Sequence, residues 1–307
     1  MRLSIELPET SSLARASGIA VAAERDGFDT FFLGAAFGFD PIMALLGCAG
    51  ATREIRLGTA VIPAFARHPL VMAQQALTAQ AATGGRFRLG IGTSHEPVMA
   101  MYGIDFDRPV GRMRDYLEVL RALLLERRVK YRGQHYSVSG MVDVEGVAAP
   151  PPVLVAALRP QMARLAGEFS DGIIPWLASA EYVRDVLIPA AAEGADRAGR
   201  SSPPIIASVP VILAASAAAA LAVAQRDLAI YPHMPFYRAV FEASRVSVPA
   251  DATWTHSMLD AATVWGDTAQ ITQGITRFFD AGAAEVICSP FGSRDLAEHL
   301  GRLAKEM

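Results

Sequence analysis

Short runs of β-branched, aromatic and other apolar residues alternate with longer helix-like stretches along this chain. Many of the short runs are apolar on both faces, which is typical of strands that lie between helices and a central core. The longer stretches have apolar residues three and four positions apart, as at Leu13, Ala16 and Ile19, which predicts amphipathic helices. The expected strands are residues 2–7, 28–34, 55–62, 86–92, 153–158, 172–176, 205–213 and 285–290.

Eight such alternations within 307 residues predict an α/β protein, and more specifically a (β/α)8 TIM barrel rather than an open sheet. No linker divides the chain, so we expect a single domain over residues 1–307. Segments 94–111 and 229–265 are expected as insertions at the C-terminal face of the strands, where loops shape substrate choice. A further segment, 127–151, precedes the fifth strand.

The composition excludes several classes of protein. With 52% hydrophobic residues and a formal net charge of -3, the chain is neither disordered nor basic enough to bind nucleic acid. Its start lacks a signal-peptide pattern, and no long uninterrupted apolar stretch offers a membrane span. Cys48 and Cys288 are the only cysteines, and the histidines lack metal-ligand spacing. We therefore expect a cytoplasmic protein without a metal site and without nucleic-acid or membrane partners.

The stretch GGRFRLGIGTSHEP, residues 84–97, combines glycines with a histidine and a glutamate. It is not a dinucleotide fingerprint, because His95 stands where the third glycine of G-x-G-x-x-G belongs. We interpret its middle as the fourth strand, with Thr93 and His95 at the carboxyl end. Gly90 and Gly92 then give either room for a planar cofactor or relief of packing within the barrel.

Five ordered stretches of the chain carry a resemblance to a known family. They are ERDGFDTFFLG, IRLGTAVIPAFARHPLVMAQQALTAQAATGGRFRLGIGTSH, YGIDFDRPVGRMRDYLEVLRALL, LVAALRPQMARLAGEFSDGIIPW and WGDTAQITQGITRFFDAGAAEVICSP. Together they resemble the luciferase-like flavin-dependent oxidoreductases, and within them the branch that uses the deazaflavin coenzyme F420. The match runs through most of residues 19–177 and then resumes, so it covers well over half the chain.

The resemblance implies a barrel whose strand ends carry the flat ring of F420, with FMN as the alternative cofactor. It also implies a non-proline cis peptide bond between Ala60 and Val61, at the end of the third strand. Contacts to the cofactor are implied at Thr59, Ala60, Val61, Thr93 and His95. A small-molecule substrate and a homodimer are further implications.

The resemblance places His95 where related deazaflavin enzymes carry an acid or base near the reactive carbon of the ring. Histidine suits this role, because its unperturbed pKa of about 6.5 lets it exchange a proton at neutral pH. A register error of one residue would assign the role to Glu96 instead. The alternative is a loop histidine that hydrogen-bonds a carbonyl group.

A turn and the start of a helix follow the fifth strand. Free backbone amides at a helix start attract anions, so the phosphate of the cofactor is expected here. Relatives commonly have Gly where Arg159 stands. Arg159 therefore either adds a charge contact to the phosphate or an acidic tail, or points into solvent. The expected cofactor-binding residues are Ala157, Leu158, Arg159, Pro160, Gln161 and Met162.

Aromatic and histidine residues beyond the strand ends are candidates for contact with the substrate. Phe37 follows the second strand, and Trp176 ends the sixth. Tyr231 and His233 lie in the insertion at 229–265. Packing or a dimer contact is the alternative interpretation for these side chains.

The activity that the resemblance implies is hydride transfer between F420 and a small organic substrate. Ala35 and Ala36 stand where several relatives have Asp and His, which favours reduction of an activated C=C or C=N bond over alcohol or sugar-phosphate oxidation. The alternatives are an FMN-dependent luciferase-like monooxygenase and a barrel that binds ligand without turnover. A sugar-phosphate isomerase is disfavoured, because no Lys or Glu base is evident at a strand end.

Overall fold

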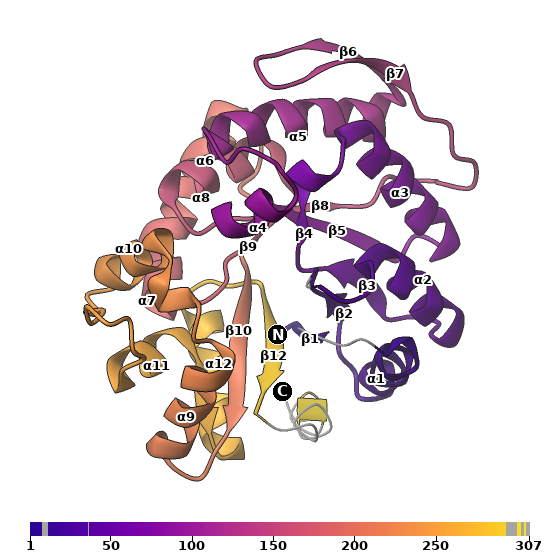
Figure 1. The fold of residues 1–307 in the computed structure, drawn as a ribbon. Helices are drawn as coiled ribbons and strands as arrows, with labels where there is room; N and C mark the ends of the chain where they lie inside the picture. The colour runs from indigo at the N-terminus through magenta and orange to yellow at the C-terminus, as the bar shows by residue number, and fades with distance from the viewer. Residues whose placement is uncertain (8–11, 36, 293–299, 302–303, 305–307) are drawn as a thin grey trace.

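The computed structural model describes residues 1–7, 12–35, 37–292, 300, 301 and 304. In this part of the chain a curled parallel sheet lies at the centre, and helices surround it (Figure 1). Hydrogen-bonded neighbours follow the order β11-β10-β12-β1-β2-β3-β5-β8-β9, and β4 pairs with β5. The strands are β1 (Leu3–Leu7), β2 (Thr30–Leu33), β3 (Arg56–Thr59), β4 (Ile62–Pro63), β5 (Phe87–Gly92), β8 (Val153–Ala156), β9 (Gly172–Ile174), β10 (Ile206–Leu213), β11 (Val264–Gly266) and β12 (Glu285–Phe291).

The two sides of the curled sheet meet at a seam between β9 and β10. No continuous ladder of backbone hydrogen bonds joins β9 to β10. Instead, isolated parallel bridges join Ile173 with Ile205 and Trp176 with Ser208, and the Ser208 amide donates to the carbonyl of Pro175 at 3.0 Å. The parallel α/β architecture expected from the sequence is thus confirmed, but no continuous ladder closes the sheet into a complete barrel.

Helices cover the outside of the sheet (Figure 1). Asp40 and His68 each accept a backbone N–H at the starts of α2 and α3, and Asp267 forms a capping box with Gln270 at α12. The helical elements are α1 (Leu13–Arg25), α2 (Pro41–Ala51), η1 (Ala64–Ala66), α3 (Pro69–Ala82), α4 (Glu96–Met101), α5 (Pro109–Glu126), α6 (Pro160–Phe169), α7 (Ala180–Tyr182), η2 (Val183–Leu187), α8 (Ile188–Arg197), α9 (Ala217–Asp227), η3 (Tyr231–His233), α10 (Pro235–Ala243), α11 (His256–Ala262) and α12 (Thr268–Asp280).

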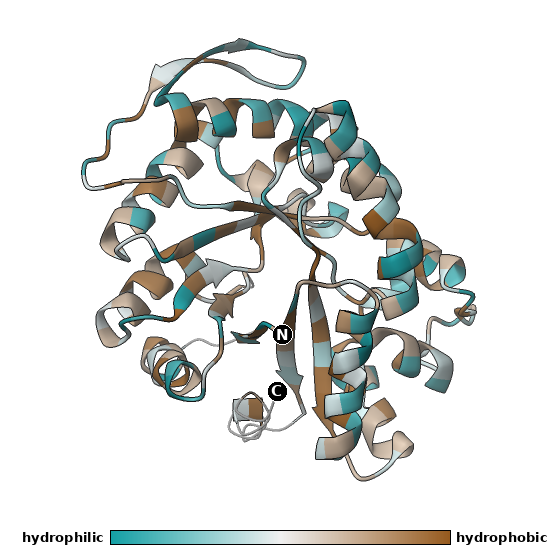
Figure 2. Cartoon of the chain, turned by 180° about the vertical axis from the view of Figure 1, so that it is seen from behind, coloured by the Kyte–Doolittle hydropathy of each residue, from teal (hydrophilic) through white to brown (hydrophobic). Residues whose placement is uncertain are grey.

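An antiparallel hairpin lies in segment 127–151, which precedes the fifth predicted strand. Its strands are β6 (Arg128–Arg132) and β7 (Ser137–Met141), and it lies at the periphery of the molecule (Figure 1). Exposed residues alternate with more covered ones along both strands, and Figure 2 shows the hairpin as largely hydrophilic. Because these strands form no apolar run, the pattern of apolar runs did not predict them.

Two further strand boundaries differ from expectation. The expected third strand, 55–62, divides into β3 and β4, with Ala60 and Val61 between them. β11 overlaps the end of the insertion expected at 229–265 and was not predicted. It has only three residues, which is too short for a strand pattern to stand out.

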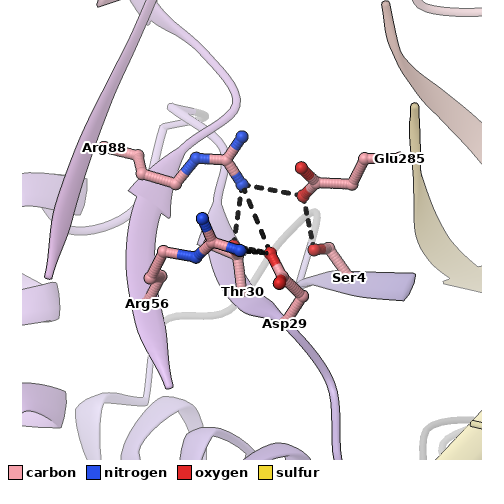
Figure 3. Close-up of polar contacts among 6 residues, drawn as sticks. All are labelled: Ser4, Asp29, Thr30, Arg56, Arg88 and Glu285. Atoms are coloured by element: carbon pink, nitrogen blue, oxygen red, sulfur yellow. Dashed lines mark hydrogen bonds and ion pairs between the residues drawn. The ribbon is translucent and has the colours of Figure 1, made fainter. Parts of the chain in front are cut away.

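Inward-facing polar side chains form a floor near the N-terminal ends of the strands (Figure 3). Arg88 Nη1 donates to Glu285 Oε1 at 2.7 Å and to Thr30 Oγ1 at 2.8 Å. Ser4 Oγ donates to the same Glu285 oxygen at 2.6 Å. The buried guanidinium and carboxylate thereby compensate each other, which a buried ion pair requires in order to be tolerated.

An apolar layer separates this floor from the mouth of the barrel, which lies at the C-terminal ends of the strands. Its members come from five different strands and pack against Ala60 and Val61. Side chains of this kind fill the interior of a parallel barrel, so the barrel is a packed core and not a channel. The members are Phe32, Leu154, Ile174, Ile206 and Ile287.

Candidate active site

The ends of β3 and β5 meet around a cis peptide bond. The bond between Ala60 and Val61 is cis, as the resemblance implied. Beside it, Thr59 Oγ1 donates to the carbonyl of Gly90 at 2.8 Å and accepts the amide of Gly90 at 2.9 Å. Ala60 and Val61 are half-buried above the apolar layer. The cis peptide therefore lies at the mouth of the barrel, where a cofactor contact was expected.

The glycines of β5 are explained by the close approach of β3. A Cβ atom on Gly90 would lie 1.8 Å from the carbonyl oxygen of Thr59. One on Gly92 would lie 3.0 Å from side-chain carbons of Val61 and Ala156. Backbone atoms of Thr59 fill the space beside Gly90, so the close packing of β3 against β5 explains this glycine. A need for room beside a cofactor does not explain it.

His95 follows the end of β5 and is the residue that precedes α4. Its imidazole stacks on Phe236, with ring centroids 5.2 Å apart, and meets Tyr237 edge-on at 6.0 Å. Nδ1 is buried and has no hydrogen-bond partner among the described residues. Burial lowers the pKa of this imidazole, so the neutral form is favoured at pH 7. Nδ1 therefore makes none of the carbonyl contacts that the alternative interpretation required.

The neighbours of His95 differ in exposure. Ser94 has φ 62°, a left-handed conformation that few residues other than glycine adopt, and this turns the chain between strand and helix. Thr93 is half-buried, and its hydroxyl donates to the carbonyl of Ser94 at 3.3 Å. Glu96 is exposed in the first turn of α4. His95 is thus the better-buried of the two candidate acid–base groups.

A carboxyl group that the sequence analysis missed lies near the end of β1. Glu6 is 6% exposed, and its Oε2 accepts from Ser289 Oγ at 2.7 Å and from Ser208 Oγ at 3.2 Å. Burial raises the pKa of Glu6 to about 7, and the two hydroxyl groups lower it in part. The carboxylate in turn helps to raise the pKa of Tyr231. This finding corrects the expectation that no Glu base stands at a strand end.

The run LSIEL contained a signal for Glu6. Alternation along a strand places Ser4 and Glu6 on the same face, and the apolar residues between and around them face the helices. A polar pair facing inward from a buried parallel strand is unusual, and it indicates an interior polar partner. What the run does not reveal is which strands supply that partner.

Five aromatic side chains form a continuous series of ring contacts, which we call the aromatic wall: Trp176, Tyr231, Phe236, Tyr237 and Phe291. Tyr237 lies 4.6 Å from Phe236 and 4.9 Å from Tyr231, measured between ring centroids. Trp176 lies 6.0 Å from Tyr231 and 6.2 Å from Phe291. Trp176 follows β9 and Phe291 ends β12, so η3 and α10 bring the remaining three rings onto the strand ends.

The phenol groups of the aromatic wall are held in the neutral form. Burial raises the pKa of Tyr231 to about 12, an effect that Trp176 opposes in part. Burial also raises the pKa of Tyr237 well above its usual value. Two of the predicted substrate residues, Trp176 and Tyr231, are therefore brought together, and Tyr231 lies beside Tyr237, which contacts His95.

The other two predicted substrate residues lie elsewhere. Phe37 is 76% exposed in the loop after β2. His233 is exposed at the end of η3. Of the alanines expected beside the ring, Ala35 is half-buried and Ala36 lies outside the described residues.

The start of α6 has the form expected of an anion site. Pro160 is its first residue, and the first backbone hydrogen bond of the helix joins the Ala163 amide to the carbonyl of Arg159 at 3.0 Å. The amides of Gln161 and Met162 therefore precede the regular bonding pattern. Arg159 and Gln161 are exposed. Ala157 and Met162 are buried, and Leu158 is half-buried and accepts a hydrogen bond from Tyr182 Oη at 2.9 Å through its carbonyl.

Residues 1–285 match the family model described as luciferase-like monooxygenase. The chain belongs to this family. A relative from Mycobacterium tuberculosis, described as an uncharacterized protein, is 32% identical over 78% of this luciferase-like chain and 75% of its own length. A putative coenzyme F420-dependent oxidoreductase from the same organism is 33% identical over 69% of the chain and 66% of its own. An F420-dependent glucose-6-phosphate dehydrogenase from Nocardia farcinica is 36% identical over 60% and 59%.

Solved structures show the same fold as this luciferase-like chain at low sequence identity. The F420-dependent tetrahydromethanopterin reductase from Methanopyrus kandleri is 20% identical, with a TM-score of 0.78 over 100% of this chain and 98% of its own. The EDTA monooxygenase from Chelativorans sp. BNC1 is also 20% identical, with a TM-score of 0.79 over 99% and 92%. The fold is thus shared by a reductase and a monooxygenase.

Two general features complete the description of this luciferase-like chain. Among the described residues, no helix combines the length and apolar character needed to cross a bilayer. In the same part of the chain, no cluster of three or more His, Cys, Asp or Glu side chains has the arrangement of a metal site.

Proposed function

We propose that this chain is an F420-dependent oxidoreductase that transfers a hydride to a small organic substrate and reduces an activated C=C or C=N bond. The observation that carries the proposal is that the aromatic wall connects two buried acid–base groups, because Tyr237 contacts His95 and Tyr231, and the charge of Glu6 acts on Tyr231. The named F420-dependent relatives support the choice of cofactor.

The described residues fit a flat ring with a phosphate arm. Thr59, Ala60 and Val61 would hold the ring at the end of β3, and the amides at the start of α6 would hold the phosphate. Nδ1 of His95 is buried without a hydrogen-bond partner among the described residues, which favours a contact between this atom and a polar group of a bound ligand. When bound, the cofactor supplies the hydride.

Glu6 and His95 are suited to different parts of the proton transfer. Glu6, with a pKa of about 7, carries a proton in a large share of molecules at neutral pH and can donate it to the reduced substrate. His95 is neutral because burial lowers its pKa, so it is suited to accept a hydrogen bond or a proton. The aromatic wall around them excludes water from the exchange.

Absorbance titration of the purified chain with F420 and with FMN tests this proposal. We expect F420 to bind more tightly, and reduced F420 to lose its hydride in a single turnover with an activated alkene or imine. Tight FMN binding with oxygen uptake would favour an FMN-dependent monooxygenase, the activity class of a solved neighbour. Cofactor binding without hydride transfer to any acceptor would favour a barrel that binds ligand without turnover.

We also propose a homodimer that forms through α2 and α3. Neither helix contains an Asp, Glu, Lys or Arg residue. Met43 on α2 is 72% exposed and Val71 on α3 is 41% exposed, so the uncharged face is open. Sedimentation of the native chain should show a dimer, and Met43→Glu should dissociate it. Leu125→Glu, on the exposed side of α5, is the control that leaves the dimer intact.

A further inference from the structure

The aromatic wall at the mouth of the barrel has no cation stacked on its rings among the described residues. Guanidinium groups lie over Phe32, Phe65, Tyr136 and Phe169, and none of these rings belongs to the aromatic wall. Burial, and to a smaller extent the charge of Glu6, raise the pKa of Tyr231 in this wall. Arg159 is exposed at the start of α6, where the proposed function assigns it to the cofactor, so no cation among these contacts is assigned to the substrate.

Two cations on neighbouring elements contact groups outside the aromatic wall. Arg238, on α10, donates to the carbonyl groups of Pro232, Val248 and Pro249 at 3.2 to 3.3 Å. Arg67, which follows η1, pairs with Asp40. Arg238 is therefore engaged by carbonyl groups, whereas Nη1 of Arg67 is buried without a hydrogen-bond partner among the described residues. The charge of Arg67 acts on Tyr116 of α5, where it opposes in part the rise in pKa that burial causes.

This arrangement disfavours an anion and favours a planar, uncharged group. The face of an aromatic ring carries partial negative charge, so a phosphate or carboxylate would lose its hydration without gaining a compensating partner. A conjugated group can instead stack on, or meet edge-on, the rings of the aromatic wall, as these rings already do with one another. Burial of flat apolar surface adds to this preference.

We infer that the substrate is an uncharged molecule that carries a planar conjugated or aromatic group beside the bond to be reduced, and not a phosphate ester or a carboxylate. The inference rests on the proposed function for the bond that is reduced, whereas the binding preference rests on the aromatic wall. It separates the chain from the relatives named as glucose-6-phosphate dehydrogenases. The reaction that precedes this one would therefore supply a neutral enone, imine or similar conjugated compound.

Equilibrium binding to the full chain, measured by calorimetry with and without F420, tests the inference. The neutral probe is benzylideneacetone, a planar enone. Cinnamate is its anionic counterpart, with a carboxylate in place of the acetyl group, and glucose 6-phosphate is the sugar-phosphate probe. We expect the enone to bind at least about tenfold more tightly than either anion. Equal or tighter binding of an anion, or no measurable binding of the enone, overturns the inference.

A matched pair of variants locates the binding site. Phe236→Ala removes a half-buried ring from the aromatic wall, and it should weaken enone binding by at least about fivefold. Phe169→Ala removes a half-buried ring that packs on Arg114 at the end of α6, and it should leave binding unchanged. Circular dichroism confirms that both variants fold. Equal affinity of the two variants for the enone overturns the inference.

The outcomes distinguish this inference from the proposed function. Enone binding without hydride transfer from F420 contradicts the proposed function and leaves the binding preference standing. Hydride transfer from F420 to a phosphorylated or carboxylated substrate, without binding of the enone, supports the proposed hydride transfer and contradicts the inference about the substrate. Arg294 lies outside the described residues, so Arg294→Ala is included. Anion binding that equals enone binding and is lost in this variant overturns the inference and identifies the missing cation.

Discussion

The imidazole of His95 stacks on the phenyl ring of Phe236, with centroids 5.2 Å apart and planes inclined by 23°. These residues lie more than one hundred positions apart, in the two insertions that were expected at the rim. Their contact covers one face of the imidazole and contributes to the burial that lowers its pKa. The two insertions thus meet over the strand ends, and the stack adds to the burial that favours the neutral form of the candidate catalytic group.

Replacement of His95 by Gln should lower the turnover of the F420-loaded enzyme by about two orders of magnitude or more, as expected for loss of an acid–base group. Glu96→Gln is the matched comparison, because Glu96 is exposed in the next helical turn. We expect it to retain nearly full activity. Single-turnover rates of hydride transfer measure both. An equal or greater loss in Glu96→Gln would show that Glu96 holds the role.

The raised pKa of Glu6 makes stability depend on pH. The proton is held more tightly in the folded chain, at about 7, than at the ordinary value of 4.5. The stabilising contribution is therefore complete below pH 4.5 and is lost as the pH rises through about 7. A shift of this size corresponds to about 3 kcal/mol. The free energy of unfolding in urea, measured near pH 4.5 and above about pH 7, should show this decrease. In Glu6→Gln the free energy of unfolding should depend less on pH over the same range. Glu126→Gln, at an exposed position, should retain the full dependence.

The same ionisation should appear in the rate of reduction. As the pH rises through about 7, Glu6 loses the proton that the proposed reaction requires, so kcat/KM should fall. On the acidic side, protonation of His95 should lower the rate only below its ordinary value of 6.5, because its pKa is lowered. Glu6→Gln should reduce the rate and abolish the alkaline limb. An alkaline limb that persists in this variant would assign it to another group.

Gly90→Ala should destabilise the fold severely, because the new Cβ atom would lie 1.8 Å from the carbonyl oxygen of Thr59. Backbone cannot yield as a side chain does, so we expect a loss of about 3 kcal/mol or more. Gly18→Ala, in α1, has nothing within 4 Å of its new Cβ. It should stabilise by about 0.5 to 1 kcal/mol, since alanine is the better helix former. Thermal unfolding of both variants tests the difference, and a mild effect of Gly90→Ala would contradict this explanation of β5.

Arg159→Ala should weaken binding of F420, with the larger loss at low salt, because screening reduces the charge contact at high salt. Arg159 is exposed beside the start of α6, where it can reach an anionic group. Arg184→Ala, at an exposed arginine paired with Asp185, is the control. Absorbance titration at two salt concentrations gives the affinities. An unchanged affinity would place Arg159 in solvent with no role in binding.

Periodicity alone determined the type and order of the main elements. Apolar runs such as IRLGTAVI and RFRLGIG predicted β3 and β5, and the (β/α)8 alternation predicted the barrel. Local sequence also predicted that α6 starts at Pro160, because proline is favoured in the first turn of a helix, where its missing N–H would have no intrahelical partner. The hairpin was missed because its half-exposed strands carry no apolar run.

The composition of the site depended on the tertiary structure. His95 was identified through the resemblance, yet the ring that buries it, Phe236, belongs to a segment with no local signal of contact. Glu6 acquires its raised pKa from burial between β10 and β12, whose serines lie more than two hundred residues away. Desolvation, ring contacts and buried hydrogen bonds arise only when distant strands and helices are packed together. Sequence periodicity therefore determined the barrel, and long-range packing decided the chemistry at its mouth.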